Sequence, residues 1–230
     1  MPQSSQYPHL LRYAETLCRS QFGKIPQSVE LKVDKRCIVF VLDGLIAEGD
    51  DRLPEDPDEL YTHLYILLDQ FIFPPLRRKV EKELGKIAYT FIDWKSENNQ
   101  AMISAFFTPN VYEPVEDIYP GKAELHLQIS RITEEVQKEP AAVESFWLDD
   151  DTVMVIRRGL LFSLEKQIVK KGFNSALRVS KRELELDRFY ENLKISDLFG
   201  RKLDAAFLDW AFDDDISLLA LKLEQAGEPA

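Results

Sequence analysis

Two Asp-Trp pairs are the residues whose types and positions could do chemistry. Asp93-Trp94 and Asp209-Trp210 recur in a similar local context, half a chain length apart. Two carboxylates held in one pocket could act as a general acid and a general base. The alternative is structural: each Asp accepts hydrogen bonds from backbone donors at a sheet edge, and each Trp packs beneath helices. Repetition favours this alternative, because a duplicated scaffold preserves its packing first. All four residues remain candidate binding residues.

Arg77 and Arg78 form a second candidate site, for a small anion. They follow Pro74-Pro75, and proline favours the first turn of a helix. We therefore expect the prolines to break a longer helical region and to start a new helix. Basic side chains near a positive helix N-terminus can hold an anion. The alternative is a solvated helix face that mixes lysines and glutamates, and the neighbouring residues favour it.

Two runs of three aspartates, 149–151 and 213–215, fall between predicted strands. Calcium and magnesium ions take several oxygen ligands, but consecutive side chains in a tight turn point apart, and the spacing of a calcium-binding loop is missing. Aspartate also favours turns because it bonds its own backbone. We therefore predict solvated hairpin turns and no metal site, with divalent-cation binding as the minor alternative.

The histidines and cysteines form no catalytic or metal-binding pattern. His9, His63 and His126 are isolated in the sequence, and there is no zinc-protease, serine-hydrolase or phosphate-loop motif. Cys18 and Cys37 lie within apolar stretches, and free cysteine packs well in a protein core. The sequence therefore predicts two buried thiols, no catalytic residues and no cofactor.

The composition excludes several classes of partner. The 230 residues carry a net charge of −11 and are 45% hydrophobic, which is typical of a globular protein but opposes binding to nucleic acid or to an anionic membrane surface. A membrane-spanning helix needs about 18 or more apolar residues, and no stretch reaches that length. Residues 1–9 have neither a basic nor an apolar region, so we expect a cytoplasmic protein without a secretion signal or direct membrane insertion.

Residues 60–73 are the best sequence evidence for an interaction surface. Apolar side chains surround most of the circumference of the helix expected there, so more than one side must be buried. The helix could lie between two parts of the chain or in a homodimer contact. Burial within the chain is the simpler alternative.

The chain contains an internal duplication. Gly85 and Gly200 precede the two Asp-Trp pairs at nearly the same distance, and residues 39–46 match residues 154–161 at the same offset. Three matches in register predict two copies of one unit. The copies span 1–107 and 122–223, with a proline-containing linker at 108–121 and a disordered tail at 224–230.

Both copies have the element order αββαββ, because period-two alternation predicts strands and longer apolar stripes predict helices. The fold class is α+β, with two antiparallel sheets, helices packed on one face of each, and an internal pseudo-dimer of the two copies. The expected helices are 7–22, 58–84, 121–137, 163–171 and 180–198. The expected strands of the first copy are 28–33, 37–42, 86–94 and 101–107, and the hairpins of the second turn at 149–151 and 213–215.

Two short motifs are similar to those of one bacterial family. Residues 22–31, FGKIPQSVEL, resemble the opening of the MpsC-like family, in which a helix ends in a Phe-Gly-x-x-Pro-x-Ser-Val run that leads into the first strand. Residues 159–166, GLLFSLEK, resemble the family's middle motif, a glycine, an apolar pair and a Glu-Lys that opens the second helical region. The first copy has GLIAEGDD at 44–51 and lacks the Glu-Lys pair. On this resemblance the chain is identified as a tandem member of the family.

The resemblance implies a soluble domain associated with a sodium-translocating, membrane-potential-generating system linked to inorganic-carbon supply. It brings no catalytic residues to this chain. The predicted function is therefore a non-enzymatic accessory or regulatory protein. It would bind a protein partner, such as a membrane ion or bicarbonate transport complex, through its apolar helical surface. The alternative is an enzyme or small-anion sensor that uses Arg77 and Arg78, or Asp93 and Asp209, in a groove between the two repeats.

Overall fold

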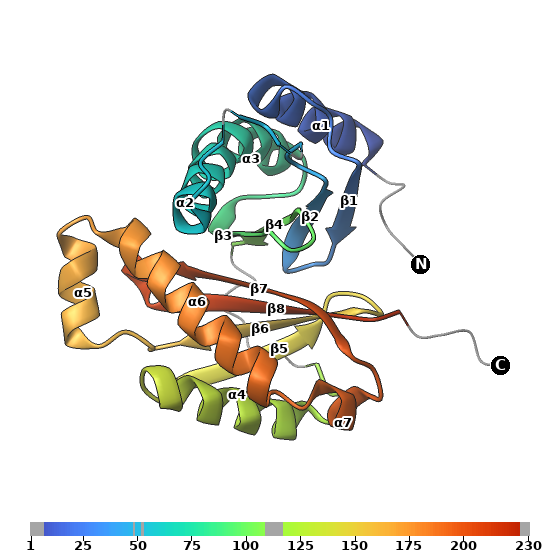
Figure 1. Ribbon diagram of the computed structural model, residues 1–230. Helices are drawn as coiled ribbons and strands as arrows, with labels where there is room; N and C mark the ends of the chain where they lie inside the picture. The colour runs from blue at the N-terminus through green and yellow to red at the C-terminus, as the bar shows by residue number, and fades with distance from the viewer. Residues whose placement is uncertain (1–6, 48, 52, 109–116, 226–230) are drawn as a thin grey trace. The chain divides into compact units, whose positions relative to one another are not determined.

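The computed structural model describes residues 7–47, 49–51, 53–108 and 117–225 (Figure 1). The chain divides into two compact units, Met1–Glu113 and Pro114–Ala230. Most of the predicted linker and most of the predicted tail lie outside the described residues. Tyr119, which was assigned to the linker, packs its ring against Trp147 with 6.0 Å between the ring centroids. The packed part of the second unit therefore begins before residue 122.

The first unit is a four-stranded antiparallel sheet with helices on one face (Figure 1). The strand order is β1-β2-β4-β3, so that two hairpins lie side by side and β2 pairs with β4 in the middle. Its elements are α1 (Pro8–Phe22), β1 (Ser28–Val33), β2 (Cys37–Asp43), α2 (Pro57–Leu67), the π-helical turn η2 (Leu68–Ile72), α3 (Phe73–Glu83), β3 (Ile87–Lys95) and β4 (Gln100–Phe107).

The second unit has the same plan. Its strand order is β5-β6-β8-β7, again fully antiparallel, and α4 and α6 cover one face of the sheet (Figure 1). Its elements are α4 (Lys122–Val136), β5 (Ala142–Trp147), β6 (Thr152–Arg158), α5 (Ser163–Lys170), α6 (Asn174–Asn192), α7 (Ile195–Phe199), β7 (Leu203–Ala211), the 3₁₀ turn η4 (Phe212–Asp214) and β8 (Ile216–Leu223).

The strand register of the two units confirms the predicted duplication. Leu42 lies opposite Ala101 in the first sheet, and Arg157 lies opposite Ser217 at the same place in the second. The edge strands β3 and β7, which correspond to each other in the two sheets, also each carry a register shift near their start. The α+β class, the αββαββ order and the antiparallel sheets are therefore confirmed. The internal pseudo-dimer stays a prediction.

The core of the second unit lies between the sheet and its helices. Alternate residues of a strand point to the same face, and those of β6, β7 and β8 that face the helices are mostly apolar. The hydrophobic core consists of Leu125, Ile129, Ile132, Val153, Val155, Leu160, Leu161, Leu186, Phe189, Leu193, Ile195, Ala206, Leu208, Trp210, Phe212, Leu219, Leu221 and Leu223.

The helical region predicted at 58–84 is not one kind of helix throughout. It consists of α2, the π-helical turn η2 and α3 in direct succession. Pro74 and Pro75 lie in the first turn of α3, as predicted for a new helix, but a π turn joins that helix to α2. Proline has no N–H, so carbonyl groups of the preceding turn lose their α-helical donors, and a π turn accommodates such a local mismatch.

The helix predicted at 180–198 is two helices, and the first starts earlier. Gly172, with φ +83°, ends α5, and α6 begins at Asn174 almost immediately afterwards. Leu193 has an extended backbone with φ −80° and ψ 112°, and it ends α6 before α7. The apolar pattern runs through both helices, which is why the break was not predicted.

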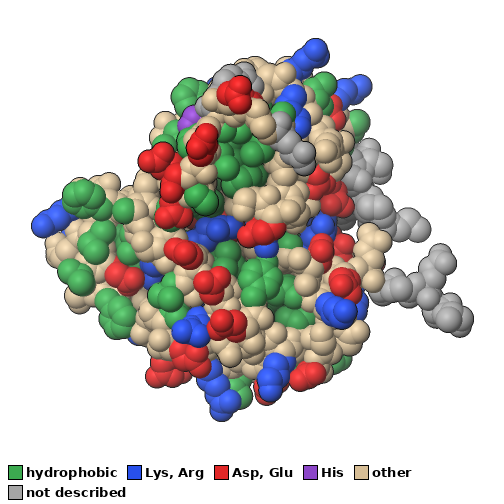
Figure 2. Space-filling view, viewed as in Figure 1, with side chains coloured by type: hydrophobic (Ala, Val, Ile, Leu, Met, Phe, Trp, Pro, Cys, Tyr) green, Lys and Arg blue, Asp and Glu red, His purple; other side chains and the backbone are tan. Residues whose placement is uncertain are grey.

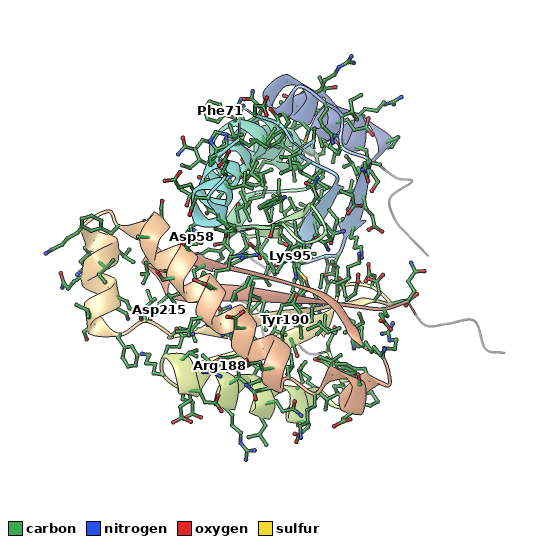
Figure 3. All side chains as sticks on the ribbon, in the orientation of Figure 1. Asp58, Phe71, Lys95, Arg188, Tyr190 and Asp215 are labelled. Carbon is green, nitrogen blue, oxygen red and sulfur yellow. The ribbon has the colours of Figure 1, made fainter. Side chains whose placement is uncertain are left out.

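Residues 60–73 are buried mainly along one face, whereas burial on more than one side was expected. Tyr61, Leu64, Leu68 and Ile72 are buried, whereas Phe71 is 48% exposed (Figure 3). Helix α2 contacts β3, and η2 contacts α1 within the same unit. The buried part of the predicted interaction surface is therefore core of the first unit, while Ile66 and Phe71 remain exposed.

Both cysteines are buried, as predicted. Burial and the charge of Glu15 raise the pKa of Cys18 to about 12. Burial, with a contribution from Asp34, also raises the pKa of Cys37 well above its usual value. Because the thiolate is the reactive form of cysteine, both thiols act as core side chains and not as nucleophiles.

Candidate functional site

Arg77 holds the end of α3 to the start of β3. Its Nε lies 3.1 Å from Glu81 Oε1, and its Nη2 donates to the Ile87 carbonyl at 2.7 Å. Burial alone would raise the pKa of Glu81, but hydrogen bonds from the Ile87 N–H and from Arg77 lower it. Arg77 is therefore engaged at a helix–strand junction, while Arg78 is exposed on the same helix.

Asp93 and Asp209 make the same contact in their two units. Each lies on an outer strand, and its Oδ1 accepts a hydrogen bond from the N–H of the following residue, Trp94 at 2.9 Å and Trp210 at 2.7 Å. Both carboxylates are buried. Asp209 also forms an ion pair with Arg178 of α6. These contacts match the structural alternative, in which the aspartates satisfy backbone donors at a sheet edge.

Trp210 packs beneath α6, as that alternative requires. Its ring is stacked on Phe212 at 5.8 Å between centroids, and the Nζ of Lys181 lies 5.8 Å from the Trp210 ring. Trp94 is buried in the first unit. Each Asp-Trp pair is thus explained by packing inside its own unit.

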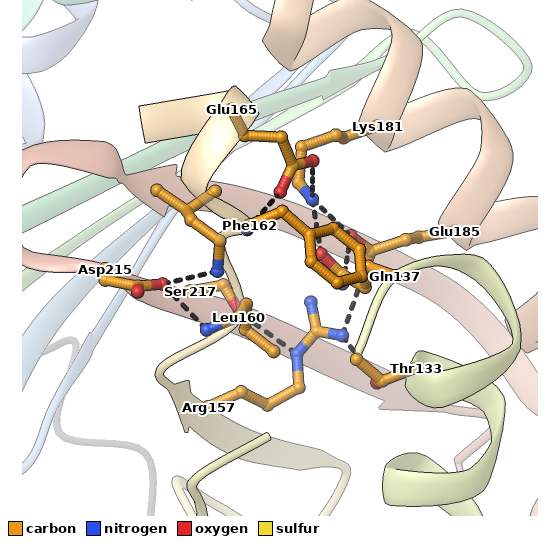
Figure 4. A network of polar contacts seen from close by, with 11 residues as sticks. Thr133, Gln137, Arg157, Leu160, Phe162, Glu165, Lys181, Glu185, Asp215 and Ser217 are labelled. Carbon is orange, nitrogen blue, oxygen red and sulfur yellow. Dashed lines mark hydrogen bonds and ion pairs between the residues drawn. The ribbon is translucent and has the colours of Figure 1, made fainter. Parts of the chain in front are cut away.

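Arg157 is the centre of a buried ionic network in the second unit (Figure 4). Its side chain is 0% exposed, and its Nη1 lies 2.7 Å from the Oε2 of Glu185, which is 2% exposed. Nη1 also donates to Thr133 Oγ1 at 2.9 Å, and Nε donates to Ser217 Oγ at 2.9 Å. One guanidinium therefore connects β6 to α4, α6 and β8.

Lys181 extends this network to α5 (Figure 4). Its Nζ lies 3.9 Å from Glu185 Oε1 and 2.9 Å from Glu165 Oε1, and it donates to Gln137. Gln137 in turn donates to Glu185 Oε1 at 2.7 Å. Glu165 Oε2 accepts the N–H of Phe162 at 2.8 Å, just before α5. The network contains two cations and two carboxylates, so its charges balance.

Asp215 fastens the backbone between β6 and α5. Its Oδ1 accepts hydrogen bonds from the N–H groups of Leu160 at 2.7 Å and Leu161 at 2.8 Å, and its Oδ2 lies 2.9 Å from Lys166 Nζ. Burial alone would raise the pKa of Asp215, but the bonds from Lys166 and from the two backbone groups hold it below its usual value. The prediction that 213–215 is only a solvated turn is therefore wrong for its last residue.

Asn99 takes the place of Asp215 in the first unit. Both residues have a positive φ, +49° and +54°, which their short polar side chains tolerate. Asn99 bonds the backbone of Ile46, with its Oδ1 accepting the N–H at 3.1 Å and its Nδ2 donating to the carbonyl at 2.7 Å. The Gly44 N–H donates to the Asn99 carbonyl, and the Gly159 N–H donates to that of Asp215. One turn-to-loop contact is thus repeated in both units.

The ionic network itself is not repeated. Leu42 and Ala101, both buried, occupy in the first unit the positions of Arg157 and Ser217. An apolar pair in one unit therefore corresponds to a hydrogen-bonded Arg-Ser pair in the other. The second unit therefore differs from the first at the centre of its sheet, and the network that begins there extends to α5 through Lys181.

A polar cluster lies at the β5 edge of the second sheet and consists of His126, Ser145 and Tyr119. The Oγ of Ser145 lies 2.6 Å from His126 Nε2 and 2.5 Å from the Tyr119 hydroxyl. Burial lowers the pKa of His126, and the nearby charge of Lys122 lowers it further. A neutral histidine next to a serine could activate a nucleophile, but Ser145 is 0% exposed. The cluster therefore joins α4 and the preceding segment to β5.

The other aspartate run, 149–151, is an ordinary hairpin turn. Asp149 Oδ1 accepts the Asp151 N–H at 3.2 Å, and Asp151 Oδ1 accepts the Thr152 hydroxyl at 2.6 Å. Within the described residues, no group of three or more His, Cys, Asp or Glu side chains is arranged to hold a metal ion.

Helix α5 presents apolar side chains to solvent. Phe162, Leu164 and Phe173 are 46%, 72% and 61% exposed, and hydrophobic side chains gather over α5 in the space-filling view (Figure 2). Every residue of α5 is described, and none of them is fully buried. Lys170 and Lys171 are exposed at its C-terminal end. We call these five side chains the α5 surface.

Neither the network nor the α5 surface was predicted from the sequence. A signal for the network was present: Arg157-Arg158 lies at the end of an otherwise apolar strand, and because neighbouring strand residues point to opposite faces, one arginine had to face the helices. For α5, the apolar pattern of residues 162–173 does not indicate which side of the helix is exposed.

Comparisons of this chain with family models, with curated proteins and with solved structures gave no match. Over the described parts of the chain, we find no helix with the length and apolar character needed to cross a membrane.

Proposed function

We propose that this chain is a cytosolic, non-enzymatic accessory or regulatory protein that binds a protein partner through the α5 surface. The observation that carries the proposal is the exposure of Phe162, Leu164 and Phe173 on and beside one short helix. Exposed apolar patches on soluble proteins mark interaction sites. Aromatic side chains are also enriched among the residues that dominate binding energy at protein interfaces.

The attachment of α5 to its unit supports this role. In most surface helices the apolar side faces the core and the charged side faces water. In α5, Glu165 and Lys166 contact Lys181 and Asp215, and Val169 packs against the core, while Leu164 faces solvent. Burial of these exposed apolar groups by a partner would be favourable at about 25 cal/mol per Å².

The burial and pairing of the polar clusters support a non-enzymatic role. The serine of the His126–Ser145 contact is buried, so a substrate cannot reach it in this state. The charges of Arg157 and Glu185 neutralise each other inside the core. Both clusters are explained by the packing of α4 and α6 on the sheet.

The similarity of 22–31 and 159–166 to the MpsC-like motifs extends the proposal to the identity of the partner. It favours a subunit of a membrane ion or bicarbonate transport system over an unrelated protein. A second copy of the chain, as a homodimer, is the competing occupant of the α5 surface. The experiment below separates the two.

The test compares two sets of serine substitutions. Phe162→Ser, Leu164→Ser and Phe173→Ser together remove the apolar part of the α5 surface, and Ile66→Ser with Phe71→Ser removes exposed apolar side chains of the first unit. Each tagged variant is purified from native cells after gentle lysis, and the co-purified proteins are quantified by mass spectrometry.

We expect one protein to co-purify with the natural chain and with the first-unit control, and to fall at least about tenfold with the α5 variant, which corresponds to about 1.4 kcal/mol of lost binding. Circular dichroism should show the same helix content for all three. Equal recovery with both variants would refute the proposal. A dimer in sedimentation that is lost only in the α5 variant would assign the surface to a second copy.

A further inference from the structure

The charge of the α5 surface is opposite to the charge of the chain as a whole. The chain carries a net charge of −11, but Lys170 and Lys171 are both exposed beside Phe173. The carboxylate of this segment, Glu165, is engaged by Lys181 in the network beneath α5. The apolar side chains at this end of the helix are therefore flanked by cations and not by acids.

From this pattern we infer that the α5 surface binds an acidic, amphipathic helical segment of the partner; the inference rests on the proposed function. Interfaces are steered by complementary potentials. At physiological salt, charges are screened beyond about 8 Å, so the two exposed lysines contribute strongly to what a segment docked beside them meets.

The spacing of the apolar side chains indicates what the segment must carry. Leu164 lies at the start of α5, and Phe173 lies just after its end. At 1.5 Å per residue the helix from Leu164 to its last residue, Lys170, spans about 9 Å, and Phe173 follows after the turn at Gly172. Two apolar anchors about two turns apart on a partner helix match this span, as in helix recognition through positions i and i+7. The carboxylates of the segment should lie beside the anchor that meets Phe173.

An anionic membrane surface fits these observations less well. A membrane is an extended negative plane, and a chain with a net charge of −11 would meet it over a wider area than the two lysines cover. A short segment contacts only the α5 surface. We therefore assign the surface to a protein segment, and a lipid is one of the outcomes that the experiment can report.

The experiment places a photoreactive amino acid at Gln167, which is exposed on α5, so that Phe162, Leu164 and Phe173 stay intact. Cross-linking is carried out in living cells with the full chain. The charge test is Lys170→Glu with Lys171→Glu. Its matched control is Lys82→Glu with Lys86→Glu, which makes the same change in net charge at exposed lysines at and beyond the end of α3.

We expect the cross-linked peptide to come from another protein and to carry a net negative charge next to apolar residues. Replacing attraction by repulsion at two exposed positions should lower the yield about tenfold, whereas the control should change it less than about twofold. Equal loss with both variants would overturn the inference, as would a basic or neutral peptide, an acyl lipid, or a cross-link to this chain or a second copy. A complete absence of cross-links at Gln167 would instead overturn the proposed function.

Discussion

Glu185→Leu should destabilise the second unit by about 3–5 kcal/mol, because it leaves the Arg157 guanidinium buried without its carboxylate. The two groups are 2.7 Å apart, and their side chains are 0% and 2% exposed, so bulk water cannot replace the lost partner. Arg157→Leu should cost less, about 1–3 kcal/mol. In that variant Glu185 keeps Gln137 at 2.7 Å and Lys181 at 3.9 Å.

The double variant, Arg157→Leu with Glu185→Leu, should be more stable than the sum of the two losses predicts. Removing both charges removes the desolvation cost of both, and apolar replacement of a buried ion pair is often close to neutral. The first unit supports this expectation, since Leu42 is buried at the position that corresponds to Arg157.

Unfolding in urea, followed by tryptophan fluorescence, measures these effects. Trp94→Phe removes the tryptophan of the first unit, so the signal comes from Trp147 and Trp210 of the second. With a slope of about 2 kcal/mol per molar urea, a loss of 4 kcal/mol lowers the midpoint by about 2 M. All variants are made in this background.

Glu191→Leu is the matched control, because Glu191 is paired with Arg188 at 2.9 Å on the same helix but with side chains that are 60% and 47% exposed (Figure 3). An exposed pair of this kind contributes about 0–1 kcal/mol. If Glu185→Leu and Glu191→Leu shifted the midpoint equally, burial would not govern the energetics of Arg157. If the losses in the double variant were additive, the two side chains would not be coupled.

Three further predictions test the backbone contacts and the core. Asp215→Asn should destabilise the second unit by about 1–3 kcal/mol at pH 7. Because folding lowers the pKa of Asp215, this stability difference is present above the pKa of the unfolded chain, about 4, and is lost as the pH falls through the pKa of the folded chain. Urea unfolding midpoints between pH 7 and 2.5 measure it. Cys18 and Cys37 should react with a thiol reagent at pH 8 only after denaturation, since a pKa of about 12 for Cys18 leaves about one thiolate in ten thousand; rapid labelling of the native chain would contradict this. Gly159→Ala should lower the urea unfolding midpoint more than Gly172→Ala. Both glycines have a positive φ, which strains alanine by about 1–2 kcal/mol. Of the two, only Gly159 would also place the new Cβ 2.7 Å from another side chain, that of Ala141.

Strands were predictable because their signal is local. The alternation at 28–33 and the apolar run at 37–42 place each residue by its own neighbours, and the structure has strands at Ser28–Val33 and Cys37–Asp43. The comparison of the two copies added the order of the elements. The π turn at Leu68–Ile72 was not predictable in this way, because it depends on how the chain accommodates two prolines between packed helices.

The partners of Arg157 in the polar network were not predictable, because they are distant from it in the sequence. Arg157 lies on β6 and Glu185 lies on α6, and α5 separates the two elements in the sequence. No local pattern in either segment indicates that these two side chains pair. Asp215 was misjudged for a related reason. Its position in an aspartate run suggested a solvated turn. The positive φ and the backbone hydrogen bonds that Asp215 shares with Asn99 of the first unit are seen only in the structure.

The divergence between the two units argues that the second has been specialised. Leu42 and Ala101 show that the shared fold needs no charge at this position, and a buried ion pair adds less stability than apolar packing of the same volume. What Arg157 and Glu185 add is directional bonding, which continues through Lys181 to Glu165 at the start of α5. These ion pairs, together with the packing of Val169 against the core, hold α5 in one orientation while Leu164 faces outward. On this argument the network exists to position the α5 surface, so Glu185→Leu should weaken binding of the partner as well as stability.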